Sequence, residues 1–232
     1  MVPSAILQSV FLIKYGNSTG TCFLISHDNN NYLITAKHIF PVSIPFDSEV
    51  DVSLYRNGGW LPFKPQPRLL YHDNSNIDIA VLEVQKDSSK HMPFDIGSKN
   101  YYSSQDCFFV GFPFGLKMDD DATGSLNQGF PLPFVKNGII SMFINDSMKM
   151  TQIFLDGHNN PGFSGGPVVI KNLDGQSQNQ MRIIGVVSAY LNEDKIIKIP
   201  YGDLINSENS GIVLSYSFDH VFEIIIRKEK KN

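Results

Sequence analysis

Three short patterns in the chain place chemically useful side chains beside strongly apolar runs. His38 directly follows the run Tyr-Leu-Ile-Thr-Ala-Lys, and Asp78 opens the run Asp-Ile-Ala-Val-Leu. Ser164 stands in the glycine-rich sequence Gly-Phe-Ser-Gly-Gly-Pro, just before Val-Val-Ile. A serine hydroxyl is a weak nucleophile that needs a general base, and the pKa of histidine suits that task. A carboxylate can hold the imidazole tautomer and stabilise the imidazolium as it forms. The three patterns together indicate nucleophilic acyl transfer through a His-Asp-Ser triad.

The glycines around Ser164 favour a second part of the same chemistry. Glycine lets the backbone turn sharply, so that neighbouring N–H groups can converge on the oxyanion of a tetrahedral intermediate. We predict that the N–H groups of Gly162 and Ser164 form this oxyanion hole. Each pattern alone has an ordinary structural interpretation, because a histidine after a strand or an aspartate before one is common. The glycine-serine block is more specific, and the order His, Asp, Ser strengthens the joint interpretation.

The elements that would position these residues are mostly short strands. Apolar or alternating runs punctuated by turn residues are typical of an all-β sandwich or barrel. The sequence Asn57-Gly58-Gly59 predicts a hairpin turn, and Asp219 is a candidate cap for a helix over 220–227. The predicted strands are 9–15, 21–26, 32–35, 49–55, 60–63, 79–84, 107–112, 137–143, 150–155, 167–170, 182–189 and 212–216.

Composition limits the classes of protein to which the chain can belong. Its 232 residues, 42% of them apolar and 18% charged, suit one globular β-domain or two small ones. The net charge is -4 and the sequence has no basic cluster, so it does not predict a basic patch that could bind nucleic acid. Cys22 and Cys107 are far apart and predict two buried thiols in a reducing compartment rather than a disulfide.

No targeting or cofactor signal stands out in the sequence. No apolar run approaches the ~20 residues that span a bilayer, and residues 1–11 do not have the pattern of a secretory signal. We therefore expect a cytoplasmic protein with no membrane and no nucleic-acid partner. His27, His72, His91 and His220 lack metal-ligand spacing and are assigned to turns and surfaces, so that no metal or cofactor is expected.

From about Gly20 to Tyr190 the chain resembles the chymotrypsin-fold serine peptidases, specifically the HtrA-like branch of bacterial trypsin-like peptidases. The runs that end at His38 and begin at Asp78 are similar to the family's histidine and aspartate motifs, and 160–167 to its serine motif. One departure is a cysteine where a strand of the family usually has glycine. Another is that the sequence has no PDZ pattern after its last predicted strand.

The resemblance implies a fold and places the site within it. The implied fold is all-β, with two packed six-stranded antiparallel β-barrels and a short C-terminal helix. Residues 1–232 would form a single peptidase domain, with 1–100 as the barrel that carries histidine and aspartate and 101–232 as the barrel that carries serine. The substrate-binding wall would lie at Val187, Ser188 and Ala189, and His158 is a further candidate for the specificity pocket. Small apolar side chains in this wall favour cleavage after small or medium apolar residues.

The predicted function is that of a serine endopeptidase acting on protein or peptide substrates through an acyl-enzyme intermediate. Because an unrestrained intracellular peptidase would damage its own cell, we expect narrow specificity and a regulatory protein partner. One alternative is a latent or non-catalytic protein-binding module on the same fold, switched by a partner that reorients the amides of Gly162 and Ser164. A third possibility, an esterase or other acyltransferase, is disfavoured because the serine does not lie in a Gly-x-Ser-x-Gly elbow.

Overall fold

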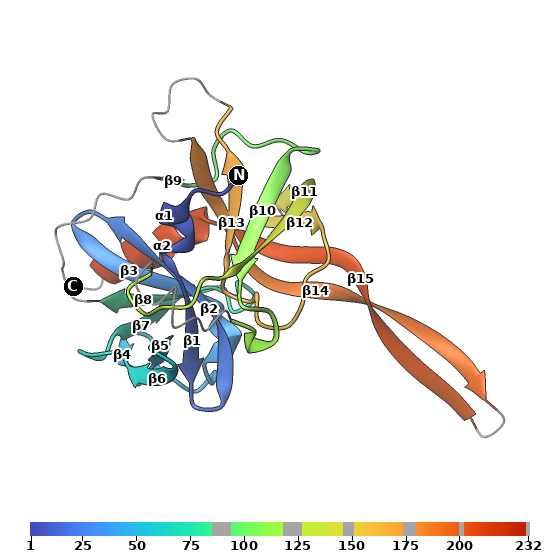
Figure 1. Ribbon diagram of the computed structural model, residues 1–232, viewed down its shortest axis with the longest axis horizontal. Helices are drawn as coiled ribbons and strands as arrows, with labels where there is room; N and C mark the ends of the chain where they lie inside the picture. Colours follow the sequence, from blue (N-terminus) through green and yellow to red (C-terminus); the bar gives the residue numbers. More distant parts are fainter. Residues whose placement is uncertain (85–93, 118–126, 146–150, 174–179, 200–201, 231–232) are drawn as a thin grey trace.

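Two curled β-sheets pack side by side in the computed structural model, which describes residues 1–84, 94–117, 127–145, 151–173, 180–199 and 202–230 (Figure 1). The first sheet has the strand order β4-β7-β8-β3-β2-β1-β5-β6. The second has the order β13-β10-β11-β12-β15-β14-β9, and a further β13–β14 pairing closes it into a ring. The expected all-β, chymotrypsin-like architecture is confirmed. The sheets have eight and seven strands rather than six, because short strands such as β4 and β9 extend them.

The first sheet is formed by the N-terminal third of the chain. The Asn57-Gly58 turn joins β5 to β6 with φ angles of 50° and 78°, as a tight hairpin turn requires. The strands are β1 Val10–Tyr15, β2 Ser18–His27, β3 Asn30–Thr35, β4 Ser48–Glu49, β5 Ser53–Arg56, β6 Gly59–Pro62, β7 Arg68–Tyr71 and β8 Ala80–Val84.

The second sheet contains two strands that are much longer than the sequence predicted. Strands β14 and β15 continue past the barrel as a projecting hairpin (Figure 1). Strand β9 pairs in parallel with β14, whereas the other pairings are antiparallel. The strands are β9 Asp95–Ile96, β10 Asp106–Gly111, β11 Phe134–Asn145, β12 Thr151–Asp156, β13 Pro167–Lys171, β14 Met181–Ile199 and β15 Gly202–Ser217.

Four helical segments complete the part of the chain that the structure describes: α1 Ser4–Leu7, the 3-10 turns η1 Lys37–Ile39 and η2 Pro113–Gly115, and α2 Asp219–Glu229. The proposed cap was wrong, because Asp219 is the first residue of α2 and Phe218 at its start makes no side-chain cap bond. Helix α2 buries Val221, Ile224 and Ile225 on one face. Within the described residues, no helix is both long and apolar enough to span a membrane.

One hydrophobic cluster joins the two sheets and α2. Phe23 from the first sheet, Phe112 and Val186 from the second, and Phe218 with Val221 beside the helix are buried together. The predicted burial of both cysteines is confirmed, and they are free thiols. Burial raises the pKa of the Cys107 thiol to about 12 and raises that of Cys22 as well, which keeps both thiols protonated and inert. This continuous core fixes the positions of the two barrels relative to each other, and with them the positions of the loops between their strands.

Candidate active site

Strand pairing in the first sheet brings His38 and Asp78 together. Strands β3 and β8 are antiparallel neighbours in which Thr35 pairs with Ala80, so the residues after β3 lie beside those before β8. The main-chain N–H of His38 donates to Asp78 Oδ1 at 2.8 Å, and His38 Nδ1 lies 2.7 Å from Asp78 Oδ2. The carboxylate thus holds the ring and fixes the proton on Nδ1. The hydrogen bond to Asp78 raises the pKa of His38, while burial opposes the rise.

Ser164 comes from the other barrel, and the first barrel holds its loop in place. The N–H of Thr21 on β2 donates to Ser164 O at 2.9 Å, and the Thr21 hydroxyl donates to Gly162 O at 2.7 Å. The same hydroxyl oxygen accepts the N–H of Phe112 at 3.1 Å. Thr21 is fully buried, so these bonds are shielded from water. They fix the serine loop against the barrel that carries His38.

Ser188 links the serine to the aspartate. Its hydroxyl donates to Asp78 Oδ2 at 2.5 Å, and its main-chain carbonyl accepts the hydroxyl of Ser164 at 2.9 Å. Ser188 is 5% exposed. In the described part of the chain, the Ser164 hydroxyl makes no hydrogen bond to His38. The sequence placed Ser188 in a substrate-binding wall and gave no signal for its bond to Asp78.

The turn before Ser164 has a backbone that requires glycine. Gly162 has φ +105°, and a Cβ there would lie 2.2 Å from the carbonyl oxygen of Phe112. The preceding carbonyl, of Pro161, accepts the N–H of Phe114 at 2.6 Å. Because C=O and N–H point in opposite directions across a trans peptide, the Gly162 N–H points away from Phe114. Among the described residues, no acceptor binds the N–H of Gly162 or of Ser164.

The other predicted wall residues contribute mainly through their backbones. Val187 is fully buried in the core of the second barrel, so its side chain is not exposed to solvent. Its carbonyl accepts the N–H of Gly165 at 2.7 Å, and its N–H donates to Gly166 O at 2.8 Å. Ala189 is half-buried, and His158 is exposed.

Two polar residues that the sequence analysis did not single out organise the loop before Ser164. Asn159 is 1% exposed, and its amide donates to Ala189 O at 3.3 Å. The ammonium of Lys136 donates to His158 O at 2.5 Å and to Asn160 Oδ1 at 2.6 Å. Burial lowers the pKa of Lys136. A lone lysine in a strand carries no motif, so only the fold could reveal this contact.

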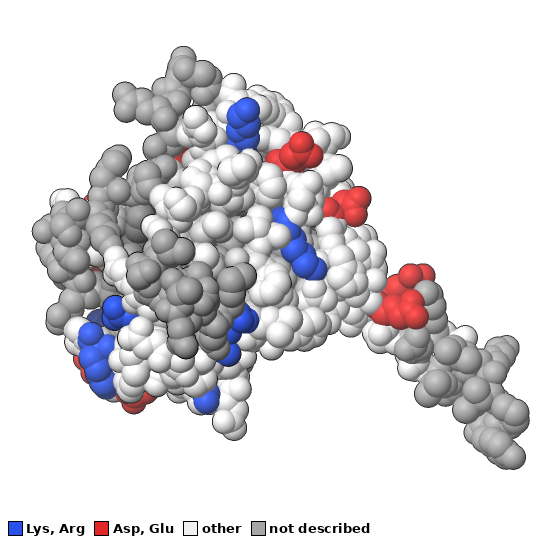
Figure 2. Space-filling model, in the orientation of Figure 1, with Lys and Arg blue, Asp and Glu red and all other residues white. Residues whose placement is uncertain are grey.

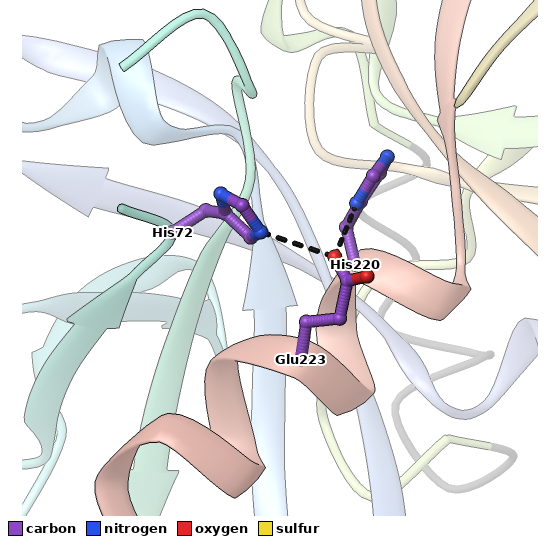
Figure 3. Close-up of side chains that lie close together, drawn as sticks. All are labelled: His72, His220 and Glu223. Atoms are coloured by element: carbon purple, nitrogen blue, oxygen red, sulfur yellow. Dashed lines mark hydrogen bonds and ion pairs between the residues drawn. The ribbon is translucent and has the colours of Figure 1, made fainter. Parts of the chain in front are cut away.

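A second polar cluster lies apart from these residues, where the end of the first sheet meets α2. His72, His220 and Glu223 bring ligand-type atoms within 4.8 Å of one another (Figure 3). His72 Nε2 lies 3.0 Å and His220 Nδ1 lies 2.7 Å from the same oxygen, Glu223 Oε2. The expectation that His220 lies at the surface was wrong, because it is 2% exposed.

Each of the two histidines has an inner ring nitrogen, which faces Glu223, and an outer one, which faces away. The hydrogen bonds of the outer nitrogens indicate whether the cluster can bind a cation. The N–H of Asn74 donates to His72 Nδ1 at 2.9 Å, and the N–H of Thr151 donates to His220 Nε2 at 3.1 Å. Each outer nitrogen is therefore an acceptor, so each inner nitrogen carries the proton that faces Glu223. Metal-ligating histidines show the opposite pattern, in which the outer N–H donates. The donor set favours a hydrogen-bonded link between the barrels and α2 over a cation site.

Comparisons with known proteins agree with the architecture. A family model described as a trypsin-like peptidase domain matches residues 20–176. No curated protein matches the chain. The Rv3671c protease of M. tuberculosis, in its inactive form, is 19% identical with a TM-score of 0.55, and the alignment covers 97% of this chain and 90% of that one.

A second similar structure is the HtrA-type protease AlgW with a tripeptide. It is 22% identical with a TM-score of 0.57, and the alignment covers 96% of this chain and 60% of that one. At these identities the two structures establish the fold alone. The similarity in sequence comes from the family model, which matches the segment that contains His38, Asp78 and Ser164.

Proposed function

Because the chain belongs to the trypsin-like peptidase family, we propose that this serine endopeptidase uses His38, Asp78 and Ser164 to hydrolyse peptide bonds of protein substrates. The observation that carries the proposal is the 2.7 Å contact between His38 Nδ1 and Asp78 Oδ2. It leaves Nε2 as the free, basic nitrogen of the ring. That nitrogen is the one that must take a proton from the nucleophile.

The proposed reaction follows from these roles. His38 Nε2 removes the Ser164 hydroxyl proton while the serine oxygen attacks the carbonyl carbon of the scissile bond. His38 then gives this proton to the leaving amine, and an acyl-enzyme remains on Ser164. Water, deprotonated by the same histidine, hydrolyses the ester. Asp78 stabilises the imidazolium in both steps.

The N–H groups of Gly162 and Ser164 form the proposed oxyanion hole. Support comes from the absence of another acceptor on either group among the described residues and from the Pro161 carbonyl, which is bound by Phe114 N–H. Donors fixed in this way before reaction stabilise the developing negative charge without reorganisation. Their removal in comparable sites costs about 10²–10³ in kcat.

The contact between Ser164 and Ser188 suggests how substrate engages the nucleophile. In the free protein the Ser164 hydroxyl donates to Ser188 O. A substrate N–H that pairs with this carbonyl would displace the hydroxyl and free it to turn toward His38. Substrate binding at the wall formed by Ser188 and Ala189 would thus activate the serine, with small or medium apolar residues preferred before the scissile bond.

Labelling with a fluorophosphonate tests this function. The wild-type protein should react covalently, and the Ser164→Ala and His38→Ala variants should not. A Ser210→Ala variant, which removes a hydroxyl bonded to Leu191 O at 2.8 Å outside the triad, serves as the matched control. Covalent labelling of Ser164→Ala to the same extent as a labelled wild type would refute the assignment of the nucleophile.

A second candidate function is a latent module that a regulatory partner switches on. The observation that favours it is again the bond from the Ser164 hydroxyl to Ser188 O in place of one to His38. In this version the purified protein does not react with the probe until a partner is added. Reaction of the purified protein alone would rule it out.

A further inference from the structure

The second barrel carries a projecting arm, which we define as residues 192–209 of β14 and β15. The two strands pair directly from Asn192 with Asn209 to Ile199 with Gly202. Figure 1 shows this hairpin extending well beyond the two barrels. Ser188 lies on the same strand, β14, as residues 192–199 of the arm. The base of the arm is therefore next to the candidate active site.

Neither face of the arm is covered along the part whose side chains are described. Glu193 and Asp194 are both exposed, and successive residues of a strand point to opposite faces. Ile196 and Ile205 are direct cross-strand partners and are 65% and 66% exposed. A two-stranded hairpin is only marginally stable alone in water. Two paired and exposed isoleucines therefore indicate a surface that is completed by a partner.

One edge of the arm is continuous with the catalytic centre. Up to Val187, the edge of β14 that faces β13 is occupied by bonds to Gly165 and Gly166. From Ala189 to Ile199, no described main-chain group pairs with that edge. This stretch spans about 35 Å at roughly 3.3 Å per residue. An unpaired edge of this length is a template for another extended strand.

We propose that the arm is an exosite that binds, as an added antiparallel strand, the substrate segment preceding the scissile bond. The inference rests on the endopeptidase function proposed above. Strand β14 runs outward from Ser188, so an antiparallel partner runs inward toward Ser164. The substrate residues N-terminal to the scissile bond therefore lie along the arm, to a length of roughly ten residues. Such a segment must have free main-chain groups, so the substrate class is an unfolded chain or an exposed flexible segment of a protein.

The direction of β14 favours this occupant over a second copy of the protein, because a substrate strand that runs inward along it reaches Ser164. The charges at the base of the arm indicate which substrate segments fit. Glu193 pairs across the strands with Glu208, and Asp194 follows directly. Figure 2 shows a group of acidic side chains at the base of the arm. A substrate segment with lysine or arginine upstream of the cleavage site would complement them.

The test compares short and long peptides on two forms of the protein. The short probe is acetyl-Ala-Ala-Pro-Val linked to aminomethylcoumarin, and the long probes carry (Thr-Lys)5 or (Thr-Glu)5 before it. In the arm-deletion variant, Asn-Gly replaces residues 193–208 between the cross-strand partners Asn192 and Asn209. For wild type, the (Thr-Lys)5 extension should raise kcat/KM at least tenfold, and the (Thr-Glu)5 extension should raise it less. For the arm-deletion variant, kcat/KM should be the same for all three probes and equal to that of wild type on the short probe.

Binding measurements keep this proposal separate from the proposed function. In the Ser164→Ala background, fluorescence anisotropy with labelled peptides should show tighter binding of the (Thr-Lys)5 peptide only when the arm is present. If fluorophosphonate labelling of the purified protein fails while this difference persists, the proposal of an enzyme that is active on its own falls and the exosite stands. Equal binding by both forms overturns the exosite. The exosite is also overturned if kcat/KM rises only when the peptide is extended on the C-terminal side of the scissile bond. A dimer in gel filtration that forms only when the arm is present would overturn it as well.

Discussion

The hydroxyl of Ser164 donates to the main-chain carbonyl of Ser188 at 2.9 Å, while the hydroxyl of Ser188 donates to Asp78. One residue therefore holds the nucleophile through its backbone and the carboxylate through its side chain. Ser188 touches both ends of the proposed triad without taking part in bond making. It acts as a positioning residue, and the two halves of the site are coupled through it.

Removal of the Ser188 hydroxyl should weaken catalysis more than binding. Ser188→Ala deletes a hydrogen bond to a charged group, and such bonds contribute about 1.5–3 kcal/mol. We expect kcat to fall about 10- to 100-fold with KM little changed, together with a shift in the pH profile. Steady-state kinetics with Ser210→Ala as the control checks this. A variant with wild-type kcat would show that Asp78 is held without Ser188.

The pH dependence of kcat/KM should report the raised pKa of His38. Because the Asp78 bond raises this pKa above 6.5, the neutral base becomes available only at higher pH, and the acidic limb should lie above pH 6.5. In Asp78→Asn the limb should move to lower pH and kcat should drop by up to about 10⁴. Rate profiles from pH 5 to 9 would measure both effects.

The same shift has a consequence for folding that can be measured separately. A raised histidine pKa stabilises the fold fully below about pH 6.5, and the contribution is lost as the pH rises through the folded-state value. The difference in urea midpoint between wild type and His38→Gln should therefore be larger at pH 5.5 than at pH 8. A difference that grows with pH would contradict the assigned direction of the shift.

Gly162→Ala should affect the reaction and the fold together. Its Cβ would meet Phe112 O at 2.2 Å in a backbone with φ +105°. The turn must then move, which misaligns the proposed oxyanion donors and should lower kcat by about 10²–10³. Gly16→Ala is the matched control, because Gly16 also has positive φ but no neighbour within 4 Å. The control should lose about 1–2 kcal/mol of stability and no activity.

The cluster of His72, His220 and Glu223 should act on stability and not on catalysis. In Glu223→Ala, two imidazole N–H groups lose their shared acceptor, which should cost about 1–3 kcal/mol in the free energy of unfolding. Glu229→Ala, at the end of the same helix, is the control. Zinc should leave the urea midpoint of wild type unchanged. A zinc-dependent rise that disappears in Glu223→Ala would overturn the hydrogen-bonded assignment.

The local residue pattern was sufficient to predict most of the strands and to propose the catalytic residues. Ile79 to Leu82 is a continuous apolar run, and all four residues are fully buried where strand β8 begins, because such a run must be shielded from water on both faces. Asn57-Gly58 predicted the hairpin because few residues adopt positive φ at both positions. The glycine-rich turn around Ser164 was recognisable for the same reason, since its conformation depends on residues adjacent in sequence.

The contacts that complete the site depend on residues far apart in the chain. Thr21 and Gly162 are joined across the two barrels, Ser188 meets Asp78, and Lys136 holds the loop before the serine. The arm was missed because the polar residues that follow Ala189 gave no hydrophobic alternation, and its strands form by pairing with each other. The sequence by itself determined the fold class and which side chains could react. Only the tertiary structure decided how those side chains are held, because hydrogen-bond partners are set by packing in three dimensions.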